Sequence, residues 1–561
     1  MVREERGLAG HGLSIKGLSI KDTSTQPEQG STVSAANPGP HILETGVPLS
    51  QSIIWRRQEN FYAQRGLKAW TEDLVPSYIT NNPLIAEMYA EIVAAYLEDC
   101  LAHIQKSSPP ISADNPLRIL ELGAGTGKFS CLFLRKLSAL LQETKIAPQV
   151  IRYCLADCSE TLIAEWRANR YLAEFADAGI LEFKLVRAEA SRTKEESQTQ
   201  KAGAPLVVIA NYVFDSLPQD AFIIADGEIS EALITTISPA NENGTPVAQS
   251  LSSLQQSFKN VPITQDRYAD KSWSAILEHY RKSLPAATIL FPSAALSLLQ
   301  ELGKSCDGRM LVLAADKGFT REDELAFSQG TPSMEFHGGG HCFSQQVNFD
   351  AFARYFWSIG GEALLPQKHF SALNICAFLQ HPPAQEFSAT RKAYEHAVNM
   401  FGPDDLFALM SWMNAHLESA SVLQAMTILR LTHWDTTAFL RLFPVIARQL
   451  RTVTAERYDL RQAVLNTWAN RYPVTHSENV LAFNCGVVLL ELRYFAEAMA
   501  MFKTSEQDFG RSATTSYNLG LCAQGLGHPA EALDYMIDAC NLDPTFEPAR
   551  ASRLELENER A

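Results

Sequence analysis

Three glycines on alternate positions form the clearest chemical pattern in this chain. The segment RILELGAGTGKFS (118–130) places Gly123, Gly125 and Gly127 after an apolar stretch that contains the acid Glu121. Glycine adopts backbone angles that other residues avoid, and it lets backbone N–H groups approach a ligand closely. The segment therefore predicts a loop that binds a phosphate, a dinucleotide or another small molecule.

Two common glycine loops do not fit this spacing. A P-loop, G-x-x-x-x-G-K-[ST], would need glycine at Leu122 and a hydroxyl at Phe129 if Lys128 were its lysine. A dinucleotide fingerprint, G-x-G-x-x-G, has its third glycine one residue later than Gly127. The first pattern fails at two positions and the second shows a milder mismatch.

The segment ELGAGTG resembles the first motif of seven-strand S-adenosylmethionine (SAM) methyltransferases. In that setting Glu121 would lie near the methionine ammonium of the cofactor, directly or through water. The next apolar stretch, VIRYCLAD (150–157), ends in Asp157, where an acid can accept the two ribose hydroxyls. The alternatives are a structural turn without a ligand and a solvated acid at a strand end.

Strand and helix patterns alternate around this loop. A chain that alternates in this way forms a parallel sheet covered by helices, so the sequence predicts an α/β fold. Ser159 is a plausible N-cap of the helix after Asp157. The expected strands are 118–122, 150–157, 180–188, 204–211 and 310–318, and the expected helices are 82–104, 128–143 and 159–175.

Further segments resemble the MidA-like family, which includes a mitochondrial complex I assembly factor. PLVVIANYVFDSLPQDAF (205–222) is similar to a family signature that reads apolar strand, A-N-E, two apolar residues, then D-A-L-P. PSYITNNPLIAEMYAE (76–91) resembles the family's FxTAPExSPLFGE stretch, and LVLAADKGF (311–319) its DYG strand. A histidine-containing stretch at 330–356 matches a fourth segment, in family order.

This resemblance implies a seven-strand Rossmann-like methyltransferase domain that methylates a protein, with symmetric dimethylation of arginine as the best-known family activity. It implies that Asn211, Tyr212 and Asp215 form the catalytic site, with Asn211 over the transferred methyl and Asp215 facing the acceptor. It also implies SAM as the cofactor. The implied cofactor contacts are Glu121, Gly123, Gly125, Gly127, Asp157, Asn211 and Thr80.

The chain departs from the family at several acids. Tyr212 replaces the glutamate of A-N-E, Asn81-Asn82-Pro83 replaces A-P-E, and Asp316-Lys317-Gly318 replaces D-Y-G. Guanidinium is protonated and a poor nucleophile, and carboxylates can hold it and localise a lone pair on one nitrogen. Losing such acids weakens the arginine prediction and leaves the cofactor prediction intact.

A repeat of 34 residues lies near the C-terminal end. Asn484, Gly486, Ala498 and Phe502 match Asn518, Gly520, Ala532 and Met536 in register. Their spacing resembles the tetratricopeptide repeat, in which small residues lie where two helices approach closely. Because one unit cannot bury its own core, we expect helical pairs back to about Ala389. A plain helical bundle is the alternative.

The sequence therefore predicts three parts. Residues 1–45 are rich in polar and turn residues and are expected to be a disordered tail. Residues 46–382 would form the methyltransferase domain, with a polar insertion at about 238–272 that reads as a surface loop or lid. Residues 383–561 would form an all-α tetratricopeptide-like domain.

Composition excludes several functions. The net charge of −15 and the pI of about 5.4 argue against general binding of nucleic acid or anionic membranes. No apolar run is long enough to span a membrane, the ten cysteines lack paired metal-ligand spacing, and no export signal is evident, so a cytoplasmic protein without a metal is expected. His337 and His341 flank Gly338-Gly339-Gly340 and are expected at the surface or beside the substrate.

The resulting hypothesis is a SAM-dependent methyltransferase that modifies a protein recruited by the helical repeats, with arginine as the candidate acceptor. One alternative is a non-catalytic scaffold, which Tyr212 favours. Another is a small-molecule methyltransferase. The sequence gives no indication of the oligomeric state.

Overall fold

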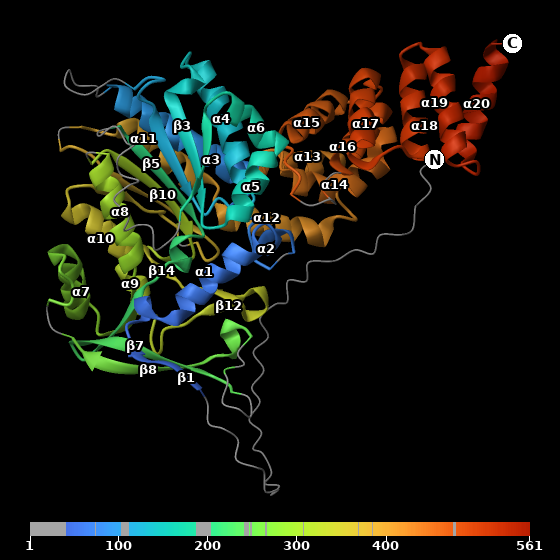
Figure 1. The fold of residues 1–561 in the computed structure, drawn as a ribbon. Coiled ribbons are helices and arrows are strands. Elements are labelled where there is room, and N and C mark those ends of the chain that lie inside the picture. The colour runs from blue at the N-terminus through green and yellow to red at the C-terminus, as the bar shows by residue number, and fades with distance from the viewer. Residues whose placement is uncertain are drawn as a thin grey trace, which may run out of the picture.

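The structure, a computed structural model, describes residues 41–560 apart from 73, 103–110, 187–203, 241–245, 247–248, 264–265, 307, 369, 384, 475–477 and 479. An α/β part is followed by an arm of helices that extends away from it (Figure 1). Most of the expected disordered tail, residues 1–40, lies outside the described residues. The last five residues of that expected tail instead belong to a strand, because 41–47 pair with a second strand far along the chain.

A seven-stranded sheet forms the centre of the α/β part. Five neighbouring strands run parallel, and β16 is antiparallel to both β10 and β15. In spatial order the strands are β15 (Glu362–Leu364), β16 (Asn374–Gln380), β10 (Met310–Asp316), β5 (Leu206–Asn211), β2 (Leu117–Leu122), β3 (Ile151–Asp157) and β4 (Leu181–Leu185). The predicted parallel α/β sheet is confirmed.

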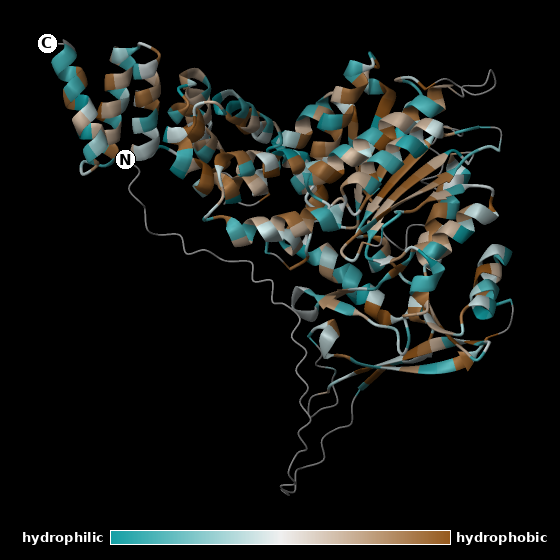
Figure 2. Cartoon of the chain, turned by 180° about the vertical axis from the view of Figure 1, so that it is seen from behind, coloured by the Kyte–Doolittle hydropathy of each residue, from teal (hydrophilic) through white to brown (hydrophobic). Residues whose placement is uncertain are grey.

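The central strands are apolar on both faces, which explains why they read as continuous apolar runs. Along β5, Val207 and Ile209 enter one buried cluster, while Val208 and Ala210 enter a cluster on the opposite face. The strands of this sheet are correspondingly hydrophobic in Figure 2.

Helices cover both faces of the large sheet. One face carries α3 (Pro83–Ala102), α4 (Lys128–Glu143), α5 (Glu160–Ala168), α6 (Arg170–Asp177) and α11 (Ser388–Met400). The other face carries α8 (Ser293–Ser305) and α10 (Phe349–Ser358), and α7 (Lys271–Ser283) packs against α10. Shorter helical segments are α9 (Glu322–Leu325), η2 (Pro148–Val150) and η5 (Phe214–Ser216).

The predicted helix at 128–143 is confirmed as α4, and the predicted N-cap Ser159 accepts a hydrogen bond from the N–H of Leu162. The single helix expected over 159–175 is wrong. It is two helices, α5 and α6, because the side chain of Asn169 accepts a 2.8 Å hydrogen bond from the N–H of Tyr171 and caps a new helix.

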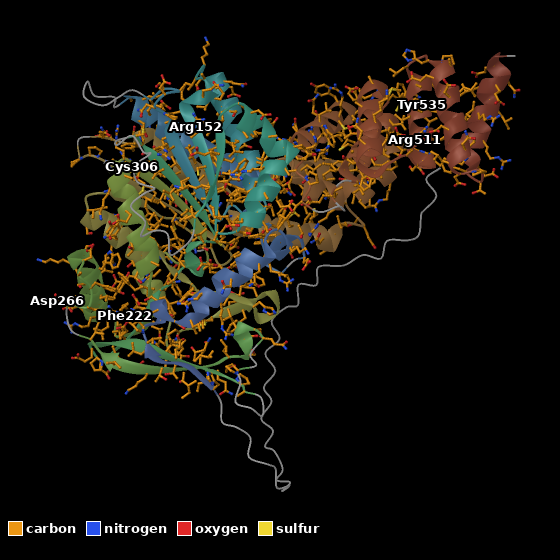
Figure 3. The ribbon with its side chains drawn as sticks, viewed as in Figure 1. Arg152, Phe222, Asp266, Cys306, Arg511 and Tyr535 are labelled. Atoms are coloured by element: carbon orange, nitrogen blue, oxygen red, sulfur yellow. The ribbon has the colours of Figure 1, made fainter. Side chains whose placement is uncertain are left out.

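A second, antiparallel sheet lies at the carboxyl end of the large one. It contains β1 (His41–Val47), β7 (Glu228–Ser238), β6 (Asp220–Ala225), β9 (Ala286–Phe291) and β8 (Gln255–Pro262). The expected loop or lid at 238–272 is therefore partly wrong, because β8 pairs along the length of β7 and η6 (Leu251–Ser253) precedes it. Arg152, near the amino end of β3, and Phe222 of this second sheet lie at opposite ends of the α/β part (Figure 3).

Helices α1 (Ile53–Arg65) and α2 (Lys68–Thr71) lie between the two sheets (Figure 1). Small pairs of strands complete this end of the domain. They are β11 (Gly318–Phe319) with β14 (Val347–Asn348), and β12 (Glu335–His337) with β13 (Cys342–Ser344), with η1 (Leu49–Gln51) before α1 and η7 (Gly338–Gly340) between β12 and β13.

Within the described residues, the arm after α11 is built of helices, with a short 3-10 turn among them. They are α12 (Pro403–His416), α13 (Val422–Leu431), α14 (Thr436–Gln449), η8 (Leu450–Thr452), α15 (Arg457–Ala469), α16 (Leu481–Glu491), α17 (Phe495–Phe509), α18 (Ala513–Gly525), α19 (Pro529–Leu542) and α20 (Glu547–Arg560). Arg511 and Tyr535 mark the far end of this arm in Figure 3.

The repeat positions lie at close helix contacts. A Cβ on Gly486 of α16 would lie 2.8 Å from the ring of Phe502 in α17, and one on Gly520 of α18 would lie 2.7 Å from Met536 in α19. Each glycine thus makes room for the large residue of its own pair. The tetratricopeptide assignment itself stays a prediction.

The α/β part and the arm share one core. A continuous cluster of buried apolar side chains runs from the large sheet through α11 into α18. Asp99 of α3 accepts hydrogen bonds from the N–H and the hydroxyl of Thr390 in α11, at 2.8 and 2.7 Å.

All ten cysteines are free, and no helix in the described ranges combines the length and apolar character needed to cross a bilayer.

Candidate functional site

The glycine loop, residues 123–127, joins the carboxyl end of β2 to α4 as predicted. Gly123, Gly125 and Gly127 have φ angles of +62°, +54° and +75°, a region that costs other residues about 1–2 kcal/mol. A Cβ on Gly125 would lie 3.3 Å from the ring of Trp70, and one on Gly127 would lie 3.0 Å from the hydroxyl of Tyr472. Both backbone angle and space therefore require glycine here.

Glu121 lies behind the loop and is only 4% exposed. Ser130 of α4 and Tyr153 of β3 donate hydrogen bonds to its carboxylate, the second at 2.7 Å. Burial raises the pKa of Glu121 to about 7, although both hydrogen bonds act in the opposite direction. Its described partners are protein side chains, so Glu121 fixes the loop between β3 and α4, and a contact with a ligand stays a prediction.

Asp157 is the last residue of β3 and lies one strand away from the loop. The N–H of Gly123 donates to the carbonyl of Ala156 at 2.9 Å, and the N–H of Ser159 donates to the Asp157 carboxylate at 3.0 Å. Burial raises the pKa of Asp157 to about 6. Cys158 also hydrogen-bonds this half-buried carboxylate through its backbone N–H and its thiol, and a contact of Asp157 with ribose hydroxyls stays a prediction.

Asn211 ends β5 beside the loop, and Tyr212 follows it. The side-chain oxygen of Asn211 accepts a 2.8 Å hydrogen bond from the hydroxyl of Tyr89 in α3. Tyr212 has a φ of +54°, and its N–H donates to the carbonyl of Ala315 at 2.9 Å. Non-glycine residues in this left-handed region are uncommon and gather at functional sites. Burial, together with Asp316 and other nearby acids, raises the pKa of the Tyr212 hydroxyl.

Asp215 and Asp316 are both buried carboxyl groups: Asp316 ends β10, and Asp215 lies in η5, the short turn that follows the neighbouring strand β5. Asp316 is fully buried; one oxygen accepts a 3.1 Å hydrogen bond from the N–H of Phe214, and the other has no hydrogen-bond partner within the described ranges. Asp215 accepts a 2.9 Å hydrogen bond from Ser216, and burial raises its pKa to about 7. Burial and then the charge of Asp215 raise the pKa of Asp316.

Aromatic side chains cover this end of the sheet. Phe61 of α1 stacks on His341 with ring centroids 5.9 Å apart, and Tyr62 stacks on Trp70 at 6.2 Å. Burial, followed by the charges of Cys342 and then Asp215, raises the pKa of Tyr62, so this cover reaches the carboxylate pair. Where the chain is described, no cluster of His, Cys, Asp or Glu has the geometry of a metal site, and the nearby His337 binds the hydroxyl of Ser344 at 3.0 Å.

Thr80 lies in the turn before α3, and its hydroxyl donates to the carbonyl of Ser77 at 3.2 Å. Next to it, Asn82 accepts a hydrogen bond from the N–H of Ile85 at 3.1 Å and caps α3. Tyr78 in the same turn donates to Asp435 of the helical arm at 3.0 Å. These hydrogen bonds tie the turn to itself and to the arm, and the cofactor contact of Thr80 stays a prediction.

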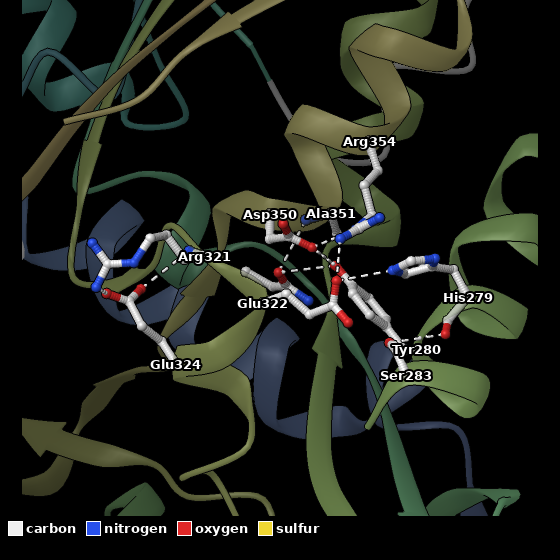
Figure 4. Close-up of polar contacts among 10 residues, drawn as sticks. His279, Tyr280, Ser283, Arg321, Glu322, Glu324, Asp350, Ala351 and Arg354 are labelled. Atoms are coloured by element: carbon white, nitrogen blue, oxygen red, sulfur yellow. Dashed lines mark hydrogen bonds and ion pairs between the residues drawn. The ribbon is translucent and has the colours of Figure 1, made fainter. Parts of the chain in front are cut away.

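A polar network outside the site holds the segment that follows Asp316 (Figure 4). Arg354 of α10 donates to Asp350 at 2.6 Å and also binds Glu322, which bonds to His279 of α7 at 2.9 Å. The hydroxyl of Tyr280 donates to Asp350 at 2.7 Å. The network ties α7, α9 and α10 together beside the β11–β14 pair, and so fixes the chain just beyond β10.

Sequence reasoning missed four contributors to this site. Asp316 ends an apolar strand, and the rule that selects Asp157 would also have selected it. Tyr153 is a polar aromatic residue inside an apolar strand, which is a weak signal of a buried partner. Trp70 and Tyr472 carry no local signal, because only the docking of α2 and of the helical arm brings them to the loop.

Comparison with known proteins agrees with the cofactor prediction. Residues 92–350 match the model of a protein family described as "Putative S-adenosyl-L-methionine-dependent methyltransferase". No curated protein is detectably similar to the chain.

Solved structures from Burkholderia thailandensis are also similar to it at 16% identity. One is an uncharacterised protein (TM-score 0.34, covering 72% of this chain and 83% of the other). The second belongs to the same superfamily and is bound to S-adenosyl-homocysteine (TM-score 0.35, covering 72% and 84%). Over residues 92–350 the chain is thus similar to SAM-dependent methyltransferases, and SAM is the cofactor of that class.

Proposed function

We propose that the chain transfers a methyl group from SAM to a nitrogen of a protein side chain, of the arginine class, and that the helical arm recruits the protein. The buried pair Asp215 and Asp316 is the observation that carries the choice of acceptor. Two like-charged carboxyl groups in a dry site disfavour each other, and a cation between them removes that penalty.

The residues at the loop fit the cofactor. The three left-handed glycines turn the loop backbone tightly at the end of β2, and Asp157 at the end of the neighbouring β3 is the type of acid that accepts ribose hydroxyls. When bound, SAM supplies a methyl group activated by the adjacent sulfonium. Glu121 acts as a positioning residue in this proposal, since it holds β3 and α4 around the loop.

The carboxylate pair suits a guanidinium. Guanidinium is protonated at neutral pH and its delocalised charge makes it a poor nucleophile. Asp215 and Asp316 would hold it by charge-assisted hydrogen bonds, localise a lone pair on one nitrogen and orient that nitrogen for in-line attack. The proton that the nitrogen loses would pass to one of these carboxylates, and Asn211, held by Tyr89, would line the transfer path.

Asp316 can take the place of the family glutamate that Tyr212 replaces in this chain. Asp316 extends from the strand next to β5, so a second carboxyl group remains beside Asp215. The ring of Tyr212 packs partly buried at the edge of the core, where it would border the acceptor.

A non-catalytic scaffold is the second candidate. It is supported by Trp70 of α2, whose ring packs against Gly125. A side chain in this position fills space beside the loop where a cofactor would be expected. A scaffold of this kind would bind its partner through the arm and would transfer no methyl group.

Two measurements test the proposal. Calorimetry with SAM should show binding to the wild type and much weaker binding to Asp157→Ala; no binding to the wild type would contradict the cofactor role. Radiolabelled SAM in a cell lysate, followed by mass spectrometry, should label a protein on a side-chain nitrogen with the wild type and with Asp323→Asn, but not with Asp316→Asn. Labelling of small molecules alone, or no labelling despite binding, would favour the alternatives.

Deletion of the arm is a poor control for this experiment. The shared core continues from the large sheet into the arm, so removal of residues 383–561 would expose apolar surface on α3 and α4. Point substitutions are therefore the informative variants.

A further inference from the structure

The helical arm contacts the glycine loop directly. The hydroxyl of Tyr472, in the segment between α15 and α16, donates a 2.8 Å hydrogen bond to the carbonyl of Thr126. The same hydroxyl accepts a 3.0 Å hydrogen bond from the side-chain amide of Asn169, and Tyr472 is only 3% exposed. A residue more than 340 positions away thus satisfies a backbone carbonyl of the loop.

The loop is shaped around this tyrosine. A Cβ on Gly127 would lie 3.0 Å from the Tyr472 hydroxyl, and the left-handed φ of +75° at Gly127 turns the backbone toward it. Next to this contact, the indole N–H of Trp166 donates to the carbonyl of Gly125 at 2.9 Å. Two consecutive stretches of loop backbone are therefore fixed by side chains from outside it.

The tyrosine is itself held firmly. Arg135 of α4 donates hydrogen bonds to the carbonyls of Ala469 and Arg471 at 3.0 Å each, and these bonds fix the backbone just before Tyr472. The guanidinium of Arg471 lies 4.3 Å from the ring centroid of Trp468, and the rings of Tyr171 and Tyr472 pack with centroids 5.6 Å apart.

The same segment is anchored deeper in the arm. The side chain of Asn470 donates to the carbonyls of His433 and Trp434 at 2.9 and 3.2 Å, across the turn between α13 and α14. Both of those residues have positive φ angles, +51° and +61°. Because the turn is fixed in an uncommon conformation, displacement of the arm would be transmitted to Tyr472 rather than absorbed by the connection.

We infer that Tyr472 is a positioning residue for the glycine loop, through which the helical arm sets the affinity of the loop for its cofactor. The positioning role of Tyr472 depends on the proposed function in one respect, namely that the ligand of the loop is SAM. By linkage, anything that binds the arm and moves this segment changes cofactor affinity, and the cofactor changes the affinity of the arm for that partner by the same factor.

Tyr472→Phe tests this role because it removes one hydroxyl and keeps the ring. Loss of a hydrogen bond to a backbone carbonyl should raise the Kd for SAM by about three- to ten-fold. Hydrogen exchange of the amides of residues 123–128 should accelerate in the ligand-free protein. The KM for SAM should rise more than kcat falls.

Asn169→Asp offers a second variant. A carboxylate still accepts the N–H of Tyr171 that caps α6, but it competes with Thr126 for the proton of the Tyr472 hydroxyl. This variant should reproduce the effect of Tyr472→Phe, and the double variant should be no weaker than either single one. Tyr458→Phe, on the exposed side of α15, should bind SAM like the wild type.

The possible outcomes are distinct. Wild-type affinity or unchanged loop exchange in Tyr472→Phe would overturn the inference, as would an equal effect of Tyr458→Phe. If loop exchange is faster in Tyr472→Phe but the wild type does not bind SAM, the positioning role of Tyr472 is retained and the proposed function is contradicted.

Discussion

The hydroxyl of Tyr153 donates a 2.7 Å hydrogen bond to the carboxylate of Glu121, inside the protein and behind the glycine loop. This contact ties β2 to β3 at the level where both strands reach the site. Because burial raises the pKa of Glu121 to about 7, a large fraction of this group is protonated near neutral pH in the ligand-free protein. The proton equilibria of the site therefore link stability and binding to pH.

Stability of the ligand-free protein should fall as pH rises from about 5 to 8. The folded-state pKa values of Glu121 and Asp215, about 7, lie above the usual carboxyl values, so the folded state binds more protons than the unfolded state in this range. Urea unfolding at pH 5 and pH 8 measures the difference. Glu121→Gln should shrink it, whereas the exposed control Glu160→Gln should leave it unchanged; an equal difference in both variants would contradict the assignment.

Binding of SAM should release protons and tighten with pH. The cofactor carries net positive charge, so it favours the ionised forms of Glu121 and Asp157, whose pKa values are raised to about 7 and about 6. Affinity should therefore increase between pH 5.5 and pH 8. Calorimetry in two buffers of different ionisation enthalpy gives the number of protons released, and net proton uptake would show that the expected coupling is absent.

Asp157→Asn should weaken SAM binding without unfolding the protein. An amide cannot accept two hydroxyl hydrogen bonds as a carboxylate does, and losing charge-assisted bonds costs about 1.5–3 kcal/mol each, so the Kd should rise on the order of a hundred-fold. Asp177→Asn, an exposed acid at the end of α6, is the matched control. Equal Kd values for the two variants would remove Asp157 from the cofactor site.

Asp316→Asn should stabilise the ligand-free protein and abolish methyl transfer. Its carboxyl group is fully buried, and burial followed by the charge of Asp215 raises its pKa, so a neutral amide should be tolerated here and should stabilise the ligand-free protein at pH 8. The amide oxygen can still accept the N–H of Phe214. Urea unfolding and a methyl-transfer assay test both effects, and a stable variant that keeps wild-type activity would exclude Asp316 from the acceptor site.

Gly486→Ala should destabilise the arm by about 1–3 kcal/mol, because its Cβ would overlap the ring of Phe502 in a packed helix pair. Gly303→Ala is the matched control, since it also lies inside a helix but meets only the flexible end of Gln380. That substitution should be neutral or stabilising, as alanine favours helix over glycine by about 1 kcal/mol. Thermal unfolding compares the two, and equal losses would exclude the close contact as the cause.

Much of the glycine loop and its flanking elements could be predicted from the sequence because their signals are local. The positive φ angles of Gly123, Gly125 and Gly127 follow from a turn that only glycine makes without strain, and their spacing is visible in the chain. The helix over 128–143 and the N-cap Ser159 were likewise predictable from periodicity and capping chemistry. The break between two helices at Asn169 and the second sheet could not be predicted. A single capping residue and the antiparallel pairing of β7 with β8 leave only weak patterns in the sequence.

By itself the sequence determined the class of loop, the parallel α/β sheet and the helical arm, since each depends on backbone preferences and on the spacing of apolar residues. Only the tertiary structure brought Asp316 near Asp215, because Asp316 ends β10, Asp215 lies in the turn after β5, and these two strands become neighbours through the order of strands in the sheet. It alone placed Tyr472 on Thr126, because that contact depends on how the arm docks against α4 and α6. Contacts between distant segments are set by packing of whole elements, and no local residue pattern encodes them.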